Sequence, residues 1–254
     1  VEWNVSTLLR LIKEIISHRT SNPVPRGKIA NQAATVLTEP LQEVKEIITL
    51  PEFKDISAKK PASEITVDEQ VIKELRHYVS CVARMYRPNA FHNFEHASHV
   101  TMSVTKLLSR IVAPTELELG DKGRNAEKMH LATLHDHTYG ITSDPLTQFA
   151  CAFSALIHDV DHTGVPNAQL IKEGSVLASC YNNRSVAEQN SLVLAWKLLF
   201  EPHFDQLRAV ICPTDAELVR FRELIVNSVM ATDIADKELK ALRNNRWDKA
   251  FCED

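Results

Sequence analysis

The sequence predicts an all-helical protein, and both its composition and its periodicity indicate this fold class. Only 6 of the 254 residues are glycine, while 44% are hydrophobic and 6% are aromatic, a balance that disfavours glycine-rich barrels and sandwiches. Apolar residues recur at the three- and four-residue spacing of amphipathic helices, and no segment alternates with the two-residue period of a strand. A chain of this length can bury a sizeable core.

The charge and the cysteines exclude several classes of protein. The net charge is −4 with interleaved signs, so no basic face for nucleic acid is expected. The five cysteines are widely spaced and form no C-x-x-C pair, which argues against a disulfide framework or a thiolate zinc site and favours a reducing, cytoplasmic location. No apolar run approaches the roughly 20 residues of a membrane-spanning helix. The sequence leaves open whether the chain belongs to a parent protein that is anchored to the cytoplasmic face of a membrane.

The ends of the chain suggest a piece of a longer protein with a short N-terminal extension. The chain begins at Val1 and stops at Asp254 within a charged stretch, so we expect an excerpt. Residues 4–16 have helical apolar spacing and are followed by a polar segment from residue 17 to residue 28. We therefore expect an N-terminal helical arm and linker over residues 1–65 and the main domain over residues 66–254.

Two helices are predicted at the start of the main domain. Thr66 and Glu69 have the spacing of a capping box, and the apolar face that follows ends before Pro88. A second stripe predicts a helix with a histidine on its apolar face. Its members are His96, Val100, Val104, Leu107, Leu108 and Ile111.

Three further helices are predicted later in the chain. Asp144 followed by Pro145 is a strong helix start, because it combines a capping acceptor with a preset φ. Ser185 and Glu188 form a second capping-box pattern. Apolar spacing over residues 218–229 predicts another helix that leads into Ala231-Thr232-Asp233.

Histidines and acids cluster in two short segments. Histidines stand at positions 92, 96 and 99, and residues 158–162 read His-Asp-Val-Asp-His. Imidazole and carboxylate groups bind zinc, iron or manganese, and a carboxylate can bridge two cations. Burying His96, His158 and Asp159 together without a cation would strand polar groups. The clustering therefore predicts a metal site, although a single histidine on an apolar stripe is more often an ordinary hydrogen-bonded residue.

Other polar residues near these segments have simpler explanations. Glu188 is already explained by the capping box, and Thr232 and Asp233 could cap a helix. Asp161 is expected to turn away from Asp159.

The remaining histidine pair, His135 and His137, falls in a polar segment that extends from residue 114. A surface loop is the favoured interpretation of that segment.

Two sequence signatures resemble those of class I 3′,5′-cyclic nucleotide phosphodiesterases. Residues 91–100, FHNFEHASHV, resemble H-N-x-x-H-A-x-D-V, and residues 158–167, HDVDHTGVPN, resemble H-D-x-x-H-x-G-x-x-N. The resemblance runs from about Thr66 to the end and is closest to the algal or protist type fused to a nucleotide cyclase. It implies a compact, multi-helix HD-type catalytic domain that is incomplete at its C-terminal side, where a further metal-binding aspartate and a purine-binding glutamine are expected.

The resemblance implies metal-dependent hydrolysis of cAMP or cGMP to the 5′-monophosphate, which ends a second-messenger signal. His96, His158 and Asp159 would bind a tightly held ion, usually zinc. Asp159 would also bridge to a second ion, magnesium or manganese. A homodimer and a fusion to a cyclase or receptor region are further expectations.

The resemblance also implies roles for the neighbouring residues. His92 would protonate the departing 3′ oxygen, and Phe91 would form an aromatic wall beside the substrate. His162 and Glu188 would hold water ligands of the second ion, with Thr232 farther out.

This chain departs from the family pattern at two positions. His99 stands where the family usually has aspartate, and Phe91 stands where it often has tyrosine. The alternatives are another phosphohydrolase of the HD superfamily and a degenerate regulatory module that binds nucleotide or a protein partner without hydrolysis.

Overall fold

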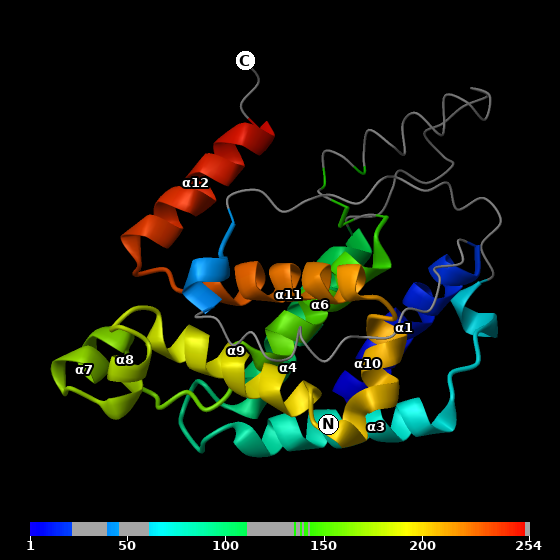
Figure 1. Ribbon diagram of the computed structural model, residues 1–254, viewed down its shortest axis with the longest axis horizontal. Helices are drawn as coiled ribbons and strands as arrows, with labels where there is room; N and C mark the ends of the chain where they lie inside the picture. Colours follow the sequence, from blue (N-terminus) through cyan, green and yellow to red (C-terminus); the bar gives the residue numbers. More distant parts are fainter. Residues whose placement is uncertain are drawn as a thin grey trace.

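The structure, a computed structural model, describes residues 1–21, 40–45, 61–110, 135, 138, 140–141 and 143–251. Within these residues it contains helices and no strands (Figure 1), which confirms the predicted fold class. The longer helices are α1 (Glu2–Ser21), α3 (Glu69–Met85), α4 (Phe94–Arg110), α6 (Pro145–Ile157), α9 (Val186–Leu199), α11 (Asp215–Met230) and α12 (Lys237–Phe251). The shorter ones are α7 (Asn167–Lys172), α8 (Val176–Cys180) and α10 (Asp205–Ile211), with single turns η1 (Pro40–Glu43), η2 (Ala62–Glu64) and η3 (Pro202–Phe204).

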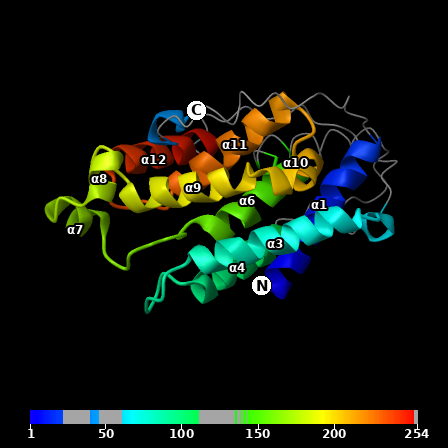
Figure 2. The ribbon, with the colours of Figure 1, turned by 60° about the horizontal axis from the view of Figure 1, so that its bottom comes forward.

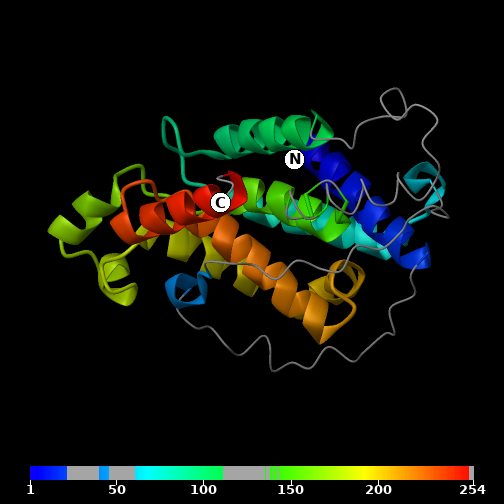
Figure 3. The same cartoon turned by 90° about the horizontal axis from the view of Figure 1, so that it is seen from above.

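Helix α6 is the centre of the molecule. Eleven of its 13 residues are buried, because a helix that is apolar on all sides must be covered on all sides. Helices α1, α4 and α11 pack against it, and Figures 2 and 3 show α4 and α11 on different sides of α6. The C-terminal end of α6 therefore emerges between neighbouring helices.

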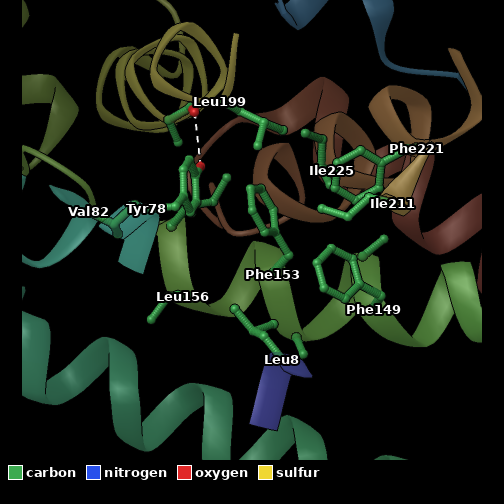
Figure 4. Close-up of a cluster of buried hydrophobic side chains, with 14 of the residues drawn as sticks. Leu8, Tyr78, Val82, Phe149, Phe153, Leu156, Leu199, Ile211, Phe221 and Ile225 are labelled. Carbon is green, nitrogen blue, oxygen red and sulfur yellow. Dashed lines mark hydrogen bonds between the residues drawn. The ribbon is translucent and has the colours of Figure 1, made fainter. Parts of the chain in front are cut away.

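Aromatic side chains join the helices around α6 (Figure 4). The ring centroid of Phe153 lies 5.6 Å from that of Tyr78, 5.9 Å from that of Phe149 and 5.4 Å from that of Phe221. The Tyr78 hydroxyl donates a hydrogen bond of 2.9 Å to the carbonyl of Ala195 in α9. One contiguous core thus connects α3, α6, α9 and α11.

Helix α1 belongs to this core. The predicted helix over residues 4–16 is confirmed, and its buried face includes Leu8 and Ile12. The helix continues through Ser21, so the linker predicted from residue 17 does not begin there. Ser17 is fully buried and its carbonyl accepts a hydrogen bond from the Thr20 hydroxyl, which explains why the polar residues stay helical. The predicted boundary at residue 65 stays a prediction.

The predicted capping box at Thr66 and Glu69 is wrong. Asp68 caps α3 instead, because its carboxylate accepts a hydrogen bond of 2.7 Å from the backbone N–H of Gln70. The predicted buried face of this helix and its end before Pro88 are confirmed.

The second predicted capping box is also wrong. Ser185 precedes α9, but its φ of 40° is left-handed and its side chain makes no cap, whereas a capping side chain requires the extended backbone. Its hydroxyl donates to the Asp233 carboxylate instead, at 2.8 Å. Glu188 therefore does not form the capping box expected of it.

The predicted start of α6 is confirmed. The Asp144 carboxylate accepts a hydrogen bond of 2.8 Å from the Thr147 backbone N–H, and Pro145 occupies the first turn. The same carboxylate pairs with Arg220 of α11. The first turn of α6 is therefore anchored to α11.

The predicted apolar face of α4 is not its buried face. Ala97 and Thr101 are fully buried, whereas the side chain of Leu107 is 57% exposed. The large apolar residues expected to be buried line an open pocket of about 310 Å³ between α4, α6 and α11 instead. Helix α4 packs against the rest of the protein through the small residues Ala97 and Thr101, so its larger apolar side chains face this pocket. Ile111 lies outside the described residues, as do residues 22–39 and 46–60.

Candidate metal centre

Two helix ends bring the first group of predicted ligands together. The Asn93 side chain accepts a hydrogen bond of 3.0 Å from the His96 N–H and begins α4, while His158 and Asp159 follow directly after α6. One ligand atom from each of His96, His158 and Asp159 lies within 4.8 Å of the others. Asp159 Oδ2 lies 3.7 Å from His96 Nε2 and 3.1 Å from His158 Nε2.

These three residues fit a divalent cation. Asp159 is only 8% exposed, and within the described residues its Oδ2 accepts no hydrogen bond of good geometry, although His158 Nε2 lies 3.1 Å away. A buried carboxylate needs a positive partner, which a protonated His158 or a cation can supply. His158 Nδ1 lies 2.9 Å from the Ala155 carbonyl and donates to it, so Nε2 carries the free lone pair that a metal requires.

The electrostatics couple the same side chains. Burial acts to lower the pKa of His158, but contact with Asp159 more than offsets it and the net pKa is raised. Burial likewise acts to raise the pKa of Asp159, yet His158 holds it below its ordinary value. The pKa of His96 is lowered, chiefly by burial. Without a cation, His158 and Asp159 form an ion pair.

A second group contains His92, His162 and again Asp159, with ligand atoms within 4.8 Å of one another. The rings of His92 and His162 stack at 3.7 Å between centroids. His162 Nδ1 accepts a hydrogen bond of 2.9 Å from the Gly164 N–H, so Nε2 of the neutral ring carries a proton and donates. In this tautomer His162 is a hydrogen-bond donor and not a direct ligand. Asp159 is the member common to both groups.

Phe91 lies at the exposed edge of the site. Its side chain is 61% exposed, and its ring centroid lies 5.0 Å from that of His92 and 4.3 Å from that of His96. Phe91 is therefore adjacent to both histidine rings, and its expected role as an aromatic wall beside the substrate stays a prediction. His99, the departure from the family pattern on the same helix, is exposed.

Glu188 belongs to a network beside the two ligand groups. Its carboxylate accepts a hydrogen bond of 2.8 Å from the Asn167 side chain, whose oxygen in turn accepts from the Ala187 N–H at 3.0 Å. Burial raises the pKa of Glu188. Asn167 was not assigned a role from sequence, although it is the last residue of the second signature.

The other candidates lie outside the two ligand groups. The Thr232 hydroxyl donates to the Val229 carbonyl at 2.7 Å, and the residue lines the apolar pocket beside His158. Asp161 pairs with Arg87 at 2.6 Å, consistent with the expected turn away from Asp159.

The histidine pair outside the signatures does not join the centre. His135 is buried and its Nδ1 bonds the Ser143 hydroxyl. Among the described residues it belongs to neither ligand group. His137 lies outside those residues.

The fold and the site together define a helical protein with a His/Asp cluster that could hold a metal ion. A sequence profile of the 3′,5′-cyclic nucleotide phosphodiesterase family matches residues 91–244, which include both ligand groups. The chain belongs to this family.

Relatives support the assignment. A probable 3′,5′-cyclic-AMP phosphodiesterase pde-4 of Caenorhabditis elegans is 30% identical over 158 residues, which cover 62% of this chain and 19% of that protein. Human cGMP-inhibited 3′,5′-cyclic phosphodiesterase 3A is 28% identical over 182 residues, covering 64% of this chain and 16% of that protein. The chain thus spans less than a fifth of these relatives' length.

A solved structure also matches. The phosphodiesterase domain of Salpingoeca rosetta rhodopsin phosphodiesterase superposes with a TM-score of 0.53 at 27% identity, covering 74% of this chain and 47% of that domain. No helix within the described residues of this chain is long and apolar enough to cross a membrane.

Proposed function

We propose that this chain takes part in the metal-dependent hydrolysis of 3′,5′-cyclic nucleotides to nucleoside 5′-monophosphates, which ends a second-messenger signal. The observation that carries the proposal is the convergence of His96 Nε2 and His158 Nε2 on the buried Oδ2 of Asp159. The match of this segment to the phosphodiesterase family supports cAMP or cGMP as the substrate.

His96, His158 and Asp159 are the residues proposed to hold the first ion, zinc. Asp159 is also proposed to contact the second, magnesium or manganese, because it is shared by both ligand groups. When bound, such cations neutralise phosphate charge and lower the pKa of water towards neutrality. The chain's own part is to hold these donors in place from α4 and the end of α6.

His92 is proposed to donate the proton to the departing 3′ oxygen. Histidine is the side chain used most often for proton transfer to a reacting group. His162 Nε2–H and the Glu188 carboxylate are proposed to orient water near the second ion, with Thr232 farther out, and the exposed Phe91 ring is proposed to contact the substrate.

The test is Asp159→Ala in the full-length protein supplied with zinc and magnesium. We expect loss of bound zinc, measured by elemental analysis, and loss of turnover of both cAMP and cGMP. Asp248→Ala on the exposed surface of α12 is the matched control and should retain both. Normal zinc in Asp159→Ala would remove this residue from the metal site, and a wild-type protein that binds zinc but hydrolyses neither nucleotide would refute the proposed activity.

A homodimer, a cytoplasmic location and a fusion to a cyclase or receptor region belong to the same proposal. The solved domain with a similar fold comes from a protein named a rhodopsin phosphodiesterase, which supports a membrane-receptor parent as one form of such a fusion. The solution mass of the full-length protein tests the homodimer.

A further inference from the structure

Two connections between helices lie against each other next to the metal centre. Residues 86–93 join α3 to α4, and residues 158–166 join α6 to α7. The Asp161 N–H donates to the Met85 carbonyl at 3.1 Å, and Arg87 pairs with the Asp161 carboxylate at 2.6 Å. The contact continues from the end of α3 towards His92 and His162.

Asn89 joins the two connections where they approach the histidines. Its side-chain nitrogen donates to the His92 carbonyl at 2.8 Å and to the His162 carbonyl at 3.2 Å. Its side-chain oxygen accepts from the Phe91 N–H at 3.2 Å. The side-chain amide of Asn89 thus forms hydrogen bonds with the backbone of His92, of His162 and of Phe91.

Gly164 lies next to the Asn89 side chain at this point. A Cβ added to Gly164 would lie 3.5 Å from the Asn89 Cβ, and Gly164 has a φ of +88° that other residues rarely adopt. The Gly164 N–H is also the group that fixes the tautomer of His162. Gly164 therefore takes part both in the contact between the two connections and in fixing the tautomer of His162.

The ring of His92 depends on this arrangement. Within the described part of the chain, ring contacts hold it: a stack on His162 at 3.7 Å with an interplanar angle of 18°, and edge contacts with Phe91 and His96. A proton donor acts only within hydrogen-bond reach of the departing oxygen. The backbone position of His92 relative to His162 thus decides where the proton can be delivered.

We propose that Asn89 is a positioning residue that holds His92 in register with His162 and Asp159. The catalytic part of this inference rests on the proposed function, whereas the structural part does not. The amide is the required group, because two carbonyls need a donor of two hydrogens and the Phe91 N–H needs an acceptor. An aspartate would keep the acceptor and lose both donors.

The structural test uses Asn89→Asp and Asn89→Ala in the full-length, metal-loaded protein with isotope-labelled histidine rings. The ring signals of His92 and His162 are identified by their disappearance in His92→Gln and His162→Gln. We expect both signals to shift or broaden in each Asn89 variant, because the stacked rings separate. Asn244→Asp, an exposed change of the same charge on α12, should leave them in place.

Zinc content separates this role from metal binding. Asn89 bonds none of His96, His158 and Asp159, so its variants should keep wild-type zinc. Unchanged ring signals in both Asn89 variants would overturn the inference, as would loss of zinc equal to that of Asp159→Ala.

The kinetic test compares a cyclic nucleotide with bis(4-nitrophenyl) phosphate, whose leaving group departs without a proton. A displacement of the donor by about 1 Å costs on the order of 100-fold, so Asn89→Ala should lower kcat for the cyclic nucleotide by roughly 10- to 100-fold and much less for the nitrophenyl diester. Equal losses for both substrates would overturn the positioning role. If the wild-type protein hydrolyses neither substrate, the proposed function fails while the ring signals still decide the role of Asn89.

Discussion

At the scale of single residues, the charge interactions of the site centre on the Asp159 carboxylate. His96 and His158 join its carboxylate in the first ligand group, and His92 and His162 join it in the second. A carboxylate buried among imidazoles is stabilised by a proton on one of them or by a cation. Protons and metal ions should therefore compete for this site.

The competition predicts a pH dependence for zinc retention. The pKa of His158 is raised above its ordinary 6.5, after the opposing effect of burial, because Asp159 stabilises the protonated ring. A raised pKa means that protons occupy His158 of the metal-free protein at a higher pH than in a free imidazole, so the affinity for zinc should decrease as the pH falls below that value. Competition with a zinc chelator of known affinity at stepwise lower pH measures this. An affinity that stays constant from about pH 8 to about pH 5 would contradict the assignment of His158 as a ligand.

The same pair sets a pH dependence for the stability of the metal-free protein. The raised pKa of His158 contributes stability below its ordinary value, which is lost as the pH rises through the folded value. The lowered pKa of Asp159 contributes stability above 3.8, which is lost as the pH falls through its folded value. We expect His158→Gln to remove the loss of Tm at rising pH. Thermal unfolding of both proteins in a chelator measures it, and parallel curves would refute the coupling.

His92 should matter for turnover and not for metal content. Replacing a general acid lowers turnover by roughly 10²- to 10⁴-fold, so His92→Ala should reduce cyclic nucleotide hydrolysis in this range and bind normal zinc. The loss should be smaller with bis(4-nitrophenyl) phosphate. His203→Ala, an exposed histidine next to α10, is the control, and equal losses on both substrates would exclude proton donation by His92.

At the scale of elements, α6 links the core to the metal centre. Its first turn is anchored to α11 through Asp144, and its last residue is followed by His158 and Asp159. Between these ends its side chains are packed on all sides. Displacing the first turn should therefore affect stability more than the geometry of the site.

Asp144 contributes both a cap and a buried ion pair. Burial opposes its ionisation, but Arg220 and Thr147 hold its pKa below the ordinary value. Losing a cap costs about 1 kcal/mol, and removing one partner of a buried pair costs about 3–5 kcal/mol, so Asp144→Ala should destabilise by about 3–5 kcal/mol and Asp144→Asn by less. Urea unfolding at neutral pH measures both.

The pH gives an internal control for this prediction. Because the pKa of Asp144 is lowered, its stabilising charge is present above 3.8 and is lost as the pH falls through the folded value. The difference between wild type and Asp144→Asn should therefore shrink in acid. A difference that is independent of pH would show that the ion pair contributes nothing.

At the scale of the whole molecule, one aromatic cluster joins α6, which carries His158 and Asp159 at its end, to α3 and α11. Phe153 contacts Tyr78, Phe149 and Phe221 and is almost fully buried (Figure 4). Because α6 belongs to this cluster, the stability of the core and the persistence of the metal centre are linked.

Phe153→Ala should destabilise the protein strongly. Truncating a buried phenylalanine costs about 3–5 kcal/mol, because contacts are lost and a cavity is left. Val219→Ala on α11, where the side chain is 53% exposed, should change stability by less than about 0.5 kcal/mol. Urea unfolding with zinc present measures both, and a cost below about 1 kcal/mol for Phe153→Ala would contradict the packing described.

Local sequence patterns predicted a helix boundary correctly where that boundary depends on residues within a single turn. The Asp144-Pro145 start succeeded because cap and proline act within one turn. Helices α7, α8, α10 and α12 were not predicted, since three are short and α12 is mostly polar. The capping box at Thr66 failed because Asp68 caps the helix, and the one at Ser185 failed because the left-handed backbone there lets its hydroxyl bond Asp233 instead.

By itself, the sequence determined the helical fold class and identified His96, His158 and Asp159 as candidate ligands, because imidazole and carboxylate groups are recognised from residue type alone. Only the tertiary structure decided which face of α4 is buried, that Glu188 joins Asn167, and that Asn89 joins the connections carrying His92 and His162. These contacts connect residues that are far apart in the chain or held by turns without a periodic pattern. Their free energy depends on packing between helices, which no local spacing encodes.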